Sequence, residues 1–375
     1  MTALDPARMR LARTLTKENV GFWCGTICSA SNRLYVGGTD FNIHVYELPM
    51  VQPCPGLPLK GHSSYVTTLL YIPATGMLVS GALDKKLLWW KPAGGEPVRR
   101  MDAGGRVNGL AVCPDGRLLV TATDDLVARV WDARNGRVLM ELKDGHPPAT
   151  FLGRRNTLYC AAFGPDGKSL ATGDRAGTVC FWNALTGKLL YKTAAATFYS
   201  QAFSRDKLAS EYEWGGVRCL AFSADGKLLV AGGMGPADQN SAGIDGPMRI
   251  EAFDTATGKS VAAFMGAPKG MLTTTLFHPT APWVLAGGGG GQAGSAGIGS
   301  LWAWNPRQLD RDGKSTAPVI HPSAIVIRDL VLSPDGNTLL AIGMQRDLTA
   351  GRIEIWDLTG KPPPATAPKP ASAKK

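Results

Sequence analysis

The sequence contains no uninterrupted run of 18 apolar residues and no Cys-x-x-Cys pair among its seven cysteines. The first absence argues against a membrane-spanning helix, and the start of the chain also lacks the apolar run of a secretory signal. The second absence, together with five scattered histidines, gives no zinc or haem pattern. Because most cysteines stand among apolar, strand-like residues, we expect reduced thiols in a core and a cytoplasmic protein.

Charged residues are also scarce, at 19%, whereas 46 of the 375 residues are glycine and 44% are apolar. This balance predicts a large buried core with many tight turns and excludes a disordered chain. The net charge is +10, but four of the lysines lie in the last fifteen residues. Without a clustered basic stripe, the charge is not by itself a nucleic-acid signature.

Two phrases recur along the chain at intervals of about fifty residues. The phrase Ala-Val-Cys-Pro-Asp-Gly at 111–116 returns in similar form at 162–167, 221–226 and 331–336. It predicts a hairpin turn, because Pro presets the first turn dihedral and Gly tolerates positive φ. The second phrase is an apolar alternation that ends in an aromatic residue, at Tyr46, Trp90, Trp131, Trp182, Phe253, Trp304 and Trp356. Seven units of four short strands each would make the blades of a propeller.

These phrases resemble the repeat of the WD-repeat family, which runs Gly-His, strand, Ser-Pro-Asp-Gly, strand, Ser-Gly-x-x-Asp, strand, Trp-Asp, strand. The resemblance covers roughly residues 8–360 and implies an all-β fold, a seven-bladed β-propeller of four-stranded antiparallel blades. We predict one propeller domain over residues 1–360 and a disordered Pro, Ala and Lys tail over 361–375. The seventh unit lacks an outer strand, and we predict that residues 9–15 supply it and close the ring, as in the family.

In the family, a buried network joins a His, a Ser or Thr, an Asp and the Trp of one blade. The second blade carries all four members, and the third lacks only the His, which is replaced by Ala103; the matching residues are His62, Ser80, Asp84 and Trp90, then Thr121, Asp125 and Trp131. In the fourth blade, Ala176 stands where the Asp is expected. Two prolines follow His146, so we expect His146 to contribute less to the stability of its blade than His62 does.

Four connections are longer than the family pattern requires, at 193–214, 234–246, 287–299 and 344–350. Because strands alternate in direction, these connections should emerge on one face, over blades five to seven. Drift in unconstrained loops accounts for their length equally well. Side chains suited to contacts favour a binding role, and we predict that a partner docks there, with Trp214 and Arg346 as anchors. The candidates are Tyr212, Glu213, Trp214, Asp238, Gln239, Asn240, Asp245, Gln292, Gln345, Arg346 and Asp347.

No motif predicts catalysis. Gly-x-Ser-x-Gly is absent, and the Gly-x-Gly-x-x-Gly match at 289–294 precedes a predicted strand instead of the helix that a dinucleotide site needs. We therefore assign no catalytic, cofactor or metal residue. The leading interpretation is a non-catalytic intracellular scaffold for protein–protein interactions, monomeric on its own and without membrane contact, whose partner the sequence does not identify. Two alternatives stay open: a propeller that binds nucleic acid or an acidic surface, and a metal-dependent hydrolase resembling a lactonase.

Overall fold

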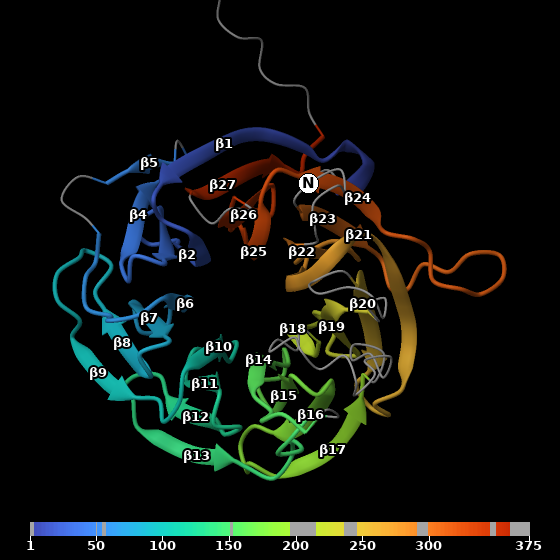
Figure 1. The fold of residues 1–375 in the computed structure, drawn as a ribbon, viewed down its shortest axis with the longest axis horizontal. Coiled ribbons are helices and arrows are strands. Elements are labelled where there is room, and N and C mark those ends of the chain that lie inside the picture. The colour runs from blue at the N-terminus through green and yellow to red at the C-terminus, as the bar shows by residue number, and fades with distance from the viewer. Residues whose placement is uncertain are drawn as a thin grey trace, which may run out of the picture.

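The computed structural model describes residues 4–49, 51–54, 58–150, 153–195, 215–235, 246–290, 299–345 and 350–360. The regular secondary structure of these residues is β-strand, apart from one short 3-10 helix, η1 (Pro6–Arg8). The strands associate into six antiparallel sheets. Figure 1 shows the sheets arranged around a ring, with one edge strand of each facing the axis and the opposite edge strand on the perimeter.

The described strands make seven groups of four, which we number as blades in chain order. Blade one is β2 (Phe22–Cys28), β3 (Arg33–Gly38), β4 (Ile43–Glu47) and β5 (Gln52–Pro53). Blade two is β6 (Val66–Ile72), β7 (Met77–Ala82), β8 (Lys86–Trp90) and β9 (Arg99–Asp102). Blade three is β10 (Val107–Val112), β11 (Leu118–Thr123), β12 (Ala128–Asp132) and β13 (Val138–Leu142). Blade four is β14 (Leu158–Phe163), β15 (Ser169–Asp174), β16 (Thr178–Asn183) and β17 (Leu189–Ala194).

Blades five and six share the long strand β21 (Ser260–Phe277), which is the outer strand of one and the inner strand of the other. Blade five begins with β18 (Val217–Phe222), β19 (Leu228–Met234) and β20 (Pro247–Asp254), and blade six continues with β22 (Val284–Gly290), β23 (Gly299–Trp304) and β24 (Val319–Ser323). The pairing changes partner at Gly270, whose φ is +144°, and a Cβ there would lie 2.7 Å from the backbone of Gly289. Only glycine fits this crossing.

The N-terminal strand closes the ring in blade seven. Its strands β25 (Val326–Leu332), β26 (Thr338–Met344) and β27 (Ala350–Asp357) are completed by β1 (Arg10–Glu18), which pairs antiparallel with β27. Arg10 reaches Asp357 at 2.8 Å, and Leu4 and Met9 are buried beside Trp356. The predicted closure is therefore confirmed, with a strand that begins one residue later and ends three residues later than the predicted 9–15.

The recurring hairpin phrases form the turns that the sequence predicts. Gly116 and Gly336 connect an inner strand to a second strand and adopt φ of 71° and 72°. At such angles an L side chain would be strained, whereas glycine is not. Each recurring aromatic residue then lies on the third strand of its blade, as the alternation predicts; Trp131 on β12 and Trp182 on β16 are both buried.

Apolar side chains fill the spaces between neighbouring blades and make the core. Polar tips of buried aromatic residues bridge the same interfaces: the Trp89 indole donates to the carbonyl of Ala133 at 3.0 Å, and the Tyr35 hydroxyl donates to that of Pro92 at 2.6 Å. All seven cysteines are free and buried, which confirms the predicted core thiols.

Every inner strand carries a β-bulge next to its start. In all seven blades the pairing with the second strand skips one residue, and a bulge aims such a residue away from the regular ladder. The skipped residues surround the axis, and we call them the channel ring: Trp23, Thr67, Asn108, Tyr159, Arg218, Thr273 and Arg328.

Side chains at or beside these bulges join each blade to the next. Where the ring residue is small, it makes the link itself: the Thr67 hydroxyl donates to the carbonyl of Val107 at 2.5 Å. Where the ring residue is large, the cysteine that follows it makes the contact with the next blade. In blade one, for example, the Cys24 thiol contacts the carbonyl of Val66 at 3.5 Å. Equivalent links start at Asn108, Cys160, Cys219 and Thr273.

The joint between blades seven and one is different because a carboxylate makes it. Asp329 accepts from the backbone N–H of Gly25 at 2.9 Å and from that of Leu330 at 2.8 Å, and the Thr274 hydroxyl lies 3.3 Å away. Burial raises the pKa of Asp329 to about 6, although these hydrogen bonds oppose the shift. Nearby, burial and the Asp329 charge raise the pKa of the Cys24 thiol well above its usual value.

We expect Asp329 to make stability depend on pH in a defined direction. Between the unfolded pKa of Asp329, 3.8, and its folded pKa of about 6, the folded state binds more protons than the unfolded state. The contribution of Asp329 to the free energy of unfolding is therefore full below pH 3.8 and is lost as the pH rises through 6. Asp329→Asn removes this titration. The free energy of unfolding of the wild type minus that of the variant, from urea titrations, should fall by at most about 3 kcal/mol from pH 4 to pH 7. A difference that is constant or increases would contradict this expectation.

Candidate functional site: the loop-bearing face and the blade networks

The three long connections inside blades leave from equivalent strand ends. Their bases are fixed by pairing of Met234 with Met248, Gly289 with Gly299, and Met344 with Gly351. In the same blades the start of the inner strand pairs with the end of the second strand, as Val217 does with Gly233. The bases of these connections therefore lie at the end of the blade that carries the channel ring, on three consecutive blades.

Most of the predicted contact residues lie outside the described part of the chain. Only Gln345 lies within it; its backbone N–H donates to the carbonyl of Ala350 at 2.8 Å and closes the base of its loop. The other ten, including the proposed anchors Trp214 and Arg346, lie in undescribed stretches, as does the tail 361–375. The binding role of these residues stays a prediction.

The four network residues of blade two lie in one hydrogen-bonded chain. The His62 ring contacts Asp84 through Nδ1 at 2.9 Å and Ser80 through Nε2 at 2.7 Å. The Trp90 indole donates to the Ser80 hydroxyl at 2.8 Å. Burial alone would raise the pKa of Asp84, but hydrogen bonds from His62 and from the backbone of Ser63 lower it below its usual value. The chain fixes the loop before the inner strand against the second and third strands.

Blade four contains an equivalent network, in which His146 makes the same kinds of contact as His62, so we no longer expect His146 to contribute less to stability. His146 contacts Asp174 through Nδ1 at 2.8 Å and Thr172 through Nε2 at 2.7 Å, and the Trp182 indole donates to Thr172 at 2.8 Å. The carboxylate comes from Asp174, two residues after the threonine, and not from the position of Ala176. Asn156 also donates to Asp174 at 2.8 Å, and Asp174 is fully buried.

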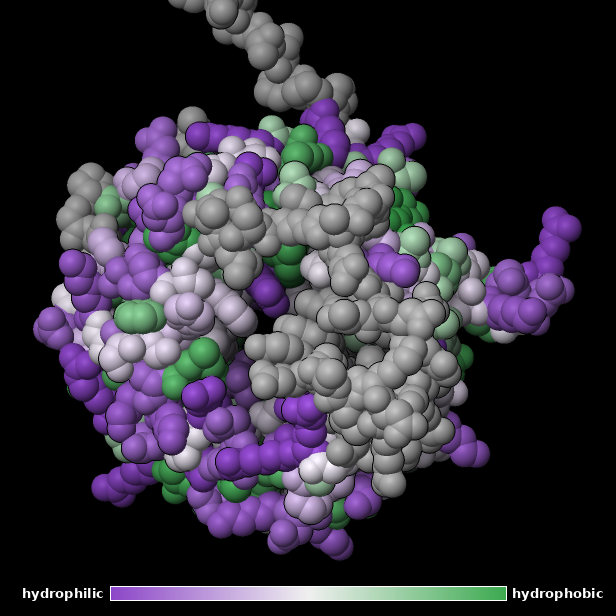
Figure 2. Space-filling view, in the orientation of Figure 1, coloured by the Kyte–Doolittle hydropathy of each residue, from purple (hydrophilic) through white to green (hydrophobic). Residues whose placement is uncertain are grey.

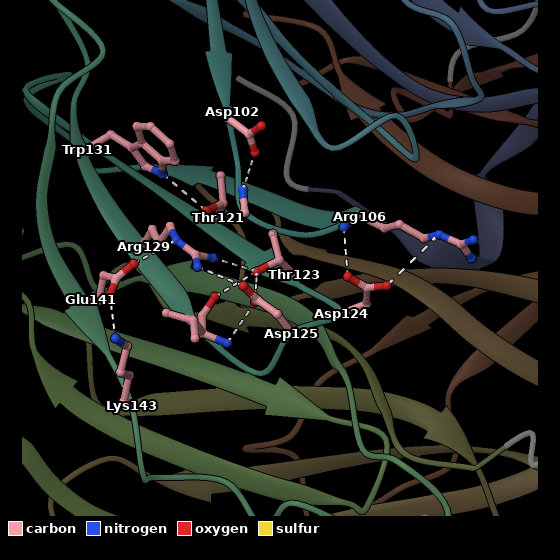
Figure 3. Close-up of polar contacts among 12 residues, drawn as sticks. Asp102, Arg106, Thr121, Thr123, Asp124, Asp125, Arg129, Trp131, Glu141 and Lys143 are labelled. Carbon is pink, nitrogen blue, oxygen red and sulfur yellow. Dashed lines mark hydrogen bonds and ion pairs between the residues drawn. The ribbon is translucent and has the colours of Figure 1, made fainter.

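Blade three divides its network into two parts, which Figure 3 shows side by side. The Trp131 indole donates to Thr121 at 3.1 Å, whereas the hydrogen bonds of Asp125 within the described chain go to other residues. Instead, Asp125 accepts from Arg129 at 2.7 Å and from Thr123 at 2.6 Å. Burial raises the pKa of Asp125, and Arg129 reverses this and holds the pKa below its usual value.

Arg129 packs against the loop that carries Ala103 in blade three. A Cβ at Gly104 would lie 2.5 Å from its guanidinium, which also contacts Glu141 at 3.0 Å. With Ala103 in the histidine position, no ring bridges Asp125 to Thr121.

The remaining blades contain buried polar pairs that the sequence analysis missed. In blade seven, Glu354 accepts from the Trp356 indole at 3.2 Å and from the Ser323 hydroxyl at 2.9 Å; burial raises the pKa of Glu354, while these donors oppose the rise. In blade six, the Trp302 indole donates to Ser300 at 2.9 Å. Glu354 and Ser300 each lie two residues before their tryptophan, on the same face of the strand. This spacing is the sequence signal that could have predicted the two pairs.

The channel ring was also missed, although the sequence carries a signal for it. A large polar or aromatic residue interrupts the apolar start of several inner strands, as Tyr159 does between Leu158 and Cys160. The ring and Leu83 line a cavity of about 300 Å³. Across the described ranges, no group of three or more His, Cys, Asp or Glu side chains is placed to hold a metal ion. In those ranges no helix is long and apolar enough to cross a membrane.

Comparison with protein families matches the three blades with networks and part of blade five. The sequence model described as "WD domain, G-beta repeat" matches residues 54–91, 95–132, 145–183 and 208–238. Together with the four-stranded blades and the His–Asp and Trp–hydroxyl contacts, these matches identify WD repeats in the matched residues. The chain contains WD repeats. Blades one, six and seven lie outside these matches, and their polar pairs differ from the pattern of blades two and four.

Curated relatives match parts of the chain. The small ribosomal subunit protein RACK1y of Oryza sativa subsp. japonica is 30% identical over 126 residues, which are 33% of this chain and 36% of that protein. Pre-mRNA-processing factor 19 of Bos taurus is 28% identical over 156 residues, 41% of this chain and 29% of that protein. Telomerase protein component 1 of Rattus norvegicus is 28% identical over 261 residues, 68% of this chain and 8% of that protein. The matches to the first two thus span about a third of each relative.

Proposed function

We propose that this WD-repeat propeller is a non-catalytic intracellular scaffold that binds protein partners through the face bearing the loops 193–214, 234–246, 287–299 and 344–350. The observation that carries the proposal is the common position of three loop bases on consecutive blades, fixed by the pairing of Met234, Gly289 and Met344. A rigid ring that holds adjacent loops at one end presents a broad surface to a partner. Trp214 and Arg346 are the proposed anchors, because Trp and Arg are enriched among residues that dominate binding energy.

The names of the relatives support an assembly role. They describe a ribosomal subunit protein, a pre-mRNA-processing factor and a telomerase component. By analogy, we propose that the chain is monomeric on its own and joins a larger assembly. A cytoplasmic location is part of the proposal, supported by seven free thiols, which persist in a reducing compartment.

Loop shortening tests this proposal. The connections of blades five, six and seven would each be cut to the length of 83–85 in blade two or 124–127 in blade three. We expect the shortened protein to keep its melting temperature, because loop length costs little, and to lose the partners that the full chain recovers in a pull-down. Unchanged recovery would place the binding surface elsewhere.

A matched control shortens a loop at the opposite end of blade six. The connection after β23 carries an isolated bridge between Leu309 and Ser315, and the turn between them is exposed. Replacing residues 310–314 by two glycines keeps the contact of the Trp304 indole with Ser315 at 3.0 Å. Partner recovery by this control should equal that of the full chain.

A further inference from the structure

The cavity at the axis is lined by aromatic, polar and positively charged side chains. Figure 2 shows a hollow at the centre, with hydrophilic side chains on its edge. Two members of the channel ring are arginines, Arg218 of blade five and Arg328 of blade seven, and each lies over an aromatic member. The guanidinium carbon of Arg218 is 3.7 Å from the centre of the Tyr159 ring, and that of Arg328 is 4.7 Å from the centre of the Trp23 ring.

Stacking on an aromatic ring orients a guanidinium and uses its face, while its N–H donors lie in its plane and stay available. Among the residues that the structure describes, the Arg328 Nε and the Trp23 Nε1 are both buried without a hydrogen-bond partner. Buried donors are nearly always paired, so two such donors beside one cavity indicate a missing acceptor.

The charge in the cavity points to an anionic acceptor. Burial and the positive charge of Arg218 lower the pKa of Arg328 to about 10, so the two cations are close enough to disfavour each other. Within the described lining of the axis, the one carboxylate is that of Asp329, and it already accepts from Gly25 and Leu330. An anion between the arginines would relieve their repulsion.

We propose that the channel ring binds one phosphate group, with Arg218 and Arg328 as its charge partners and Trp23 as a neutral donor. The donors come from blades five, seven and one, so they approach from different sides. A tetrahedral oxyanion offers acceptors in all of these directions, whereas a planar carboxylate does not. The cavity of about 300 Å³ has room for a phosphate ion or a small phosphomonoester. This site is independent of the proposed loop contacts.

Calorimetric titration of the full chain tests the site. The protein, dialysed free of phosphate and sulfate, would be titrated at constant ionic strength with inorganic phosphate, phosphoserine and acetate. We expect saturable binding of phosphate or phosphoserine at one site per chain. Tighter binding of phosphoserine identifies a phosphomonoester, and binding of phosphate alone identifies the free ion; both support the proposal. Absence of saturable binding, or acetate binding as tight as phosphate, would overturn it.

Variants localise the binding. Arg328→Gln should weaken phosphate affinity at least tenfold, and Arg328→Lys, which keeps the charge but loses the planar fork, should weaken it less. Trp23→Phe keeps the aromatic face, removes the N–H and should weaken binding about threefold, a test that stands even if Arg328→Gln does not fold. Arg99→Gln is the matched control, because Arg99 lies over the Trp89 ring at 5.7 Å on the outer part of blade two. Equal affinity in the wild type, Arg328→Lys and Trp23→Phe would overturn the assignment.

Discussion

A chain that begins at Val20 should melt at least about 6 °C below the full chain. The truncation removes β1, exposes the edge of β27 and takes Leu4 and Met9 out of the core. Burial of two such side chains contributes about 3 to 6 kcal/mol, and 1 kcal/mol shifts the melting temperature of a domain this large by about 2 to 4 °C. Differential scanning calorimetry measures the shift.

Removal of residues 361–375 is the control for this truncation. These residues lie outside the described chain, and their composition predicts no contribution to the core. The melting temperature should therefore not change. If the chain that begins at Val20 has the same melting temperature as the full chain, closure of the ring by β1 does not stabilise the fold.

His146→Ala should cost at least as much stability as His62→Ala, about 1 to 3 kcal/mol for each. Without the ring, the carboxylate of Asp174 and the hydroxyl of Thr172 each lose a hydrogen bond in a site closed to water. The Asp174 side chain is 0% exposed and that of Asp84 is 7% exposed. Water can therefore replace the lost histidine ring no more easily in blade four than in blade two. Urea unfolding at neutral pH gives both values.

His44→Ala provides a comparison in blade one. His44 also contacts an aspartate, Asp40, at 3.1 Å, but the Asp40 side chain is 28% exposed, so water can replace the ring. We expect a loss below about 1 kcal/mol. A larger loss for His44→Ala than for His146→Ala would show that burial of the aspartate does not set the cost.

The architecture could be predicted because its signals are local. The turn phrases around Gly116 and Gly336, and the aromatic residues of the third strands, each report on a few neighbouring positions. Ring closure followed from counting strands in the last unit. In contrast, Asp174 was overlooked because a carboxylate can reach the same histidine from two residues after the threonine as well as from four.

The channel ring could not be derived from periodicity alone. A bulge changes the direction of one side chain, and the alternation of apolar and polar residues along a strand does not show where a bulge occurs. Arg218 and Arg328 are 110 positions apart, and only the closed ring brings them to one cavity. The contact residues on the long loops depend even less on local pattern, because their positions follow from loop conformation and a partner.

Site-specific photo-crosslinking tests the scaffold proposal most directly. A photoreactive amino acid would replace Gln345, at the base of a long loop, or Asp312, in the exposed turn at the opposite end of blade six. Each protein would be irradiated with the partners that the full chain recovers. The proposed binding face predicts a crosslinked partner from position 345 and none from position 312. A partner captured from position 312 alone would contradict it.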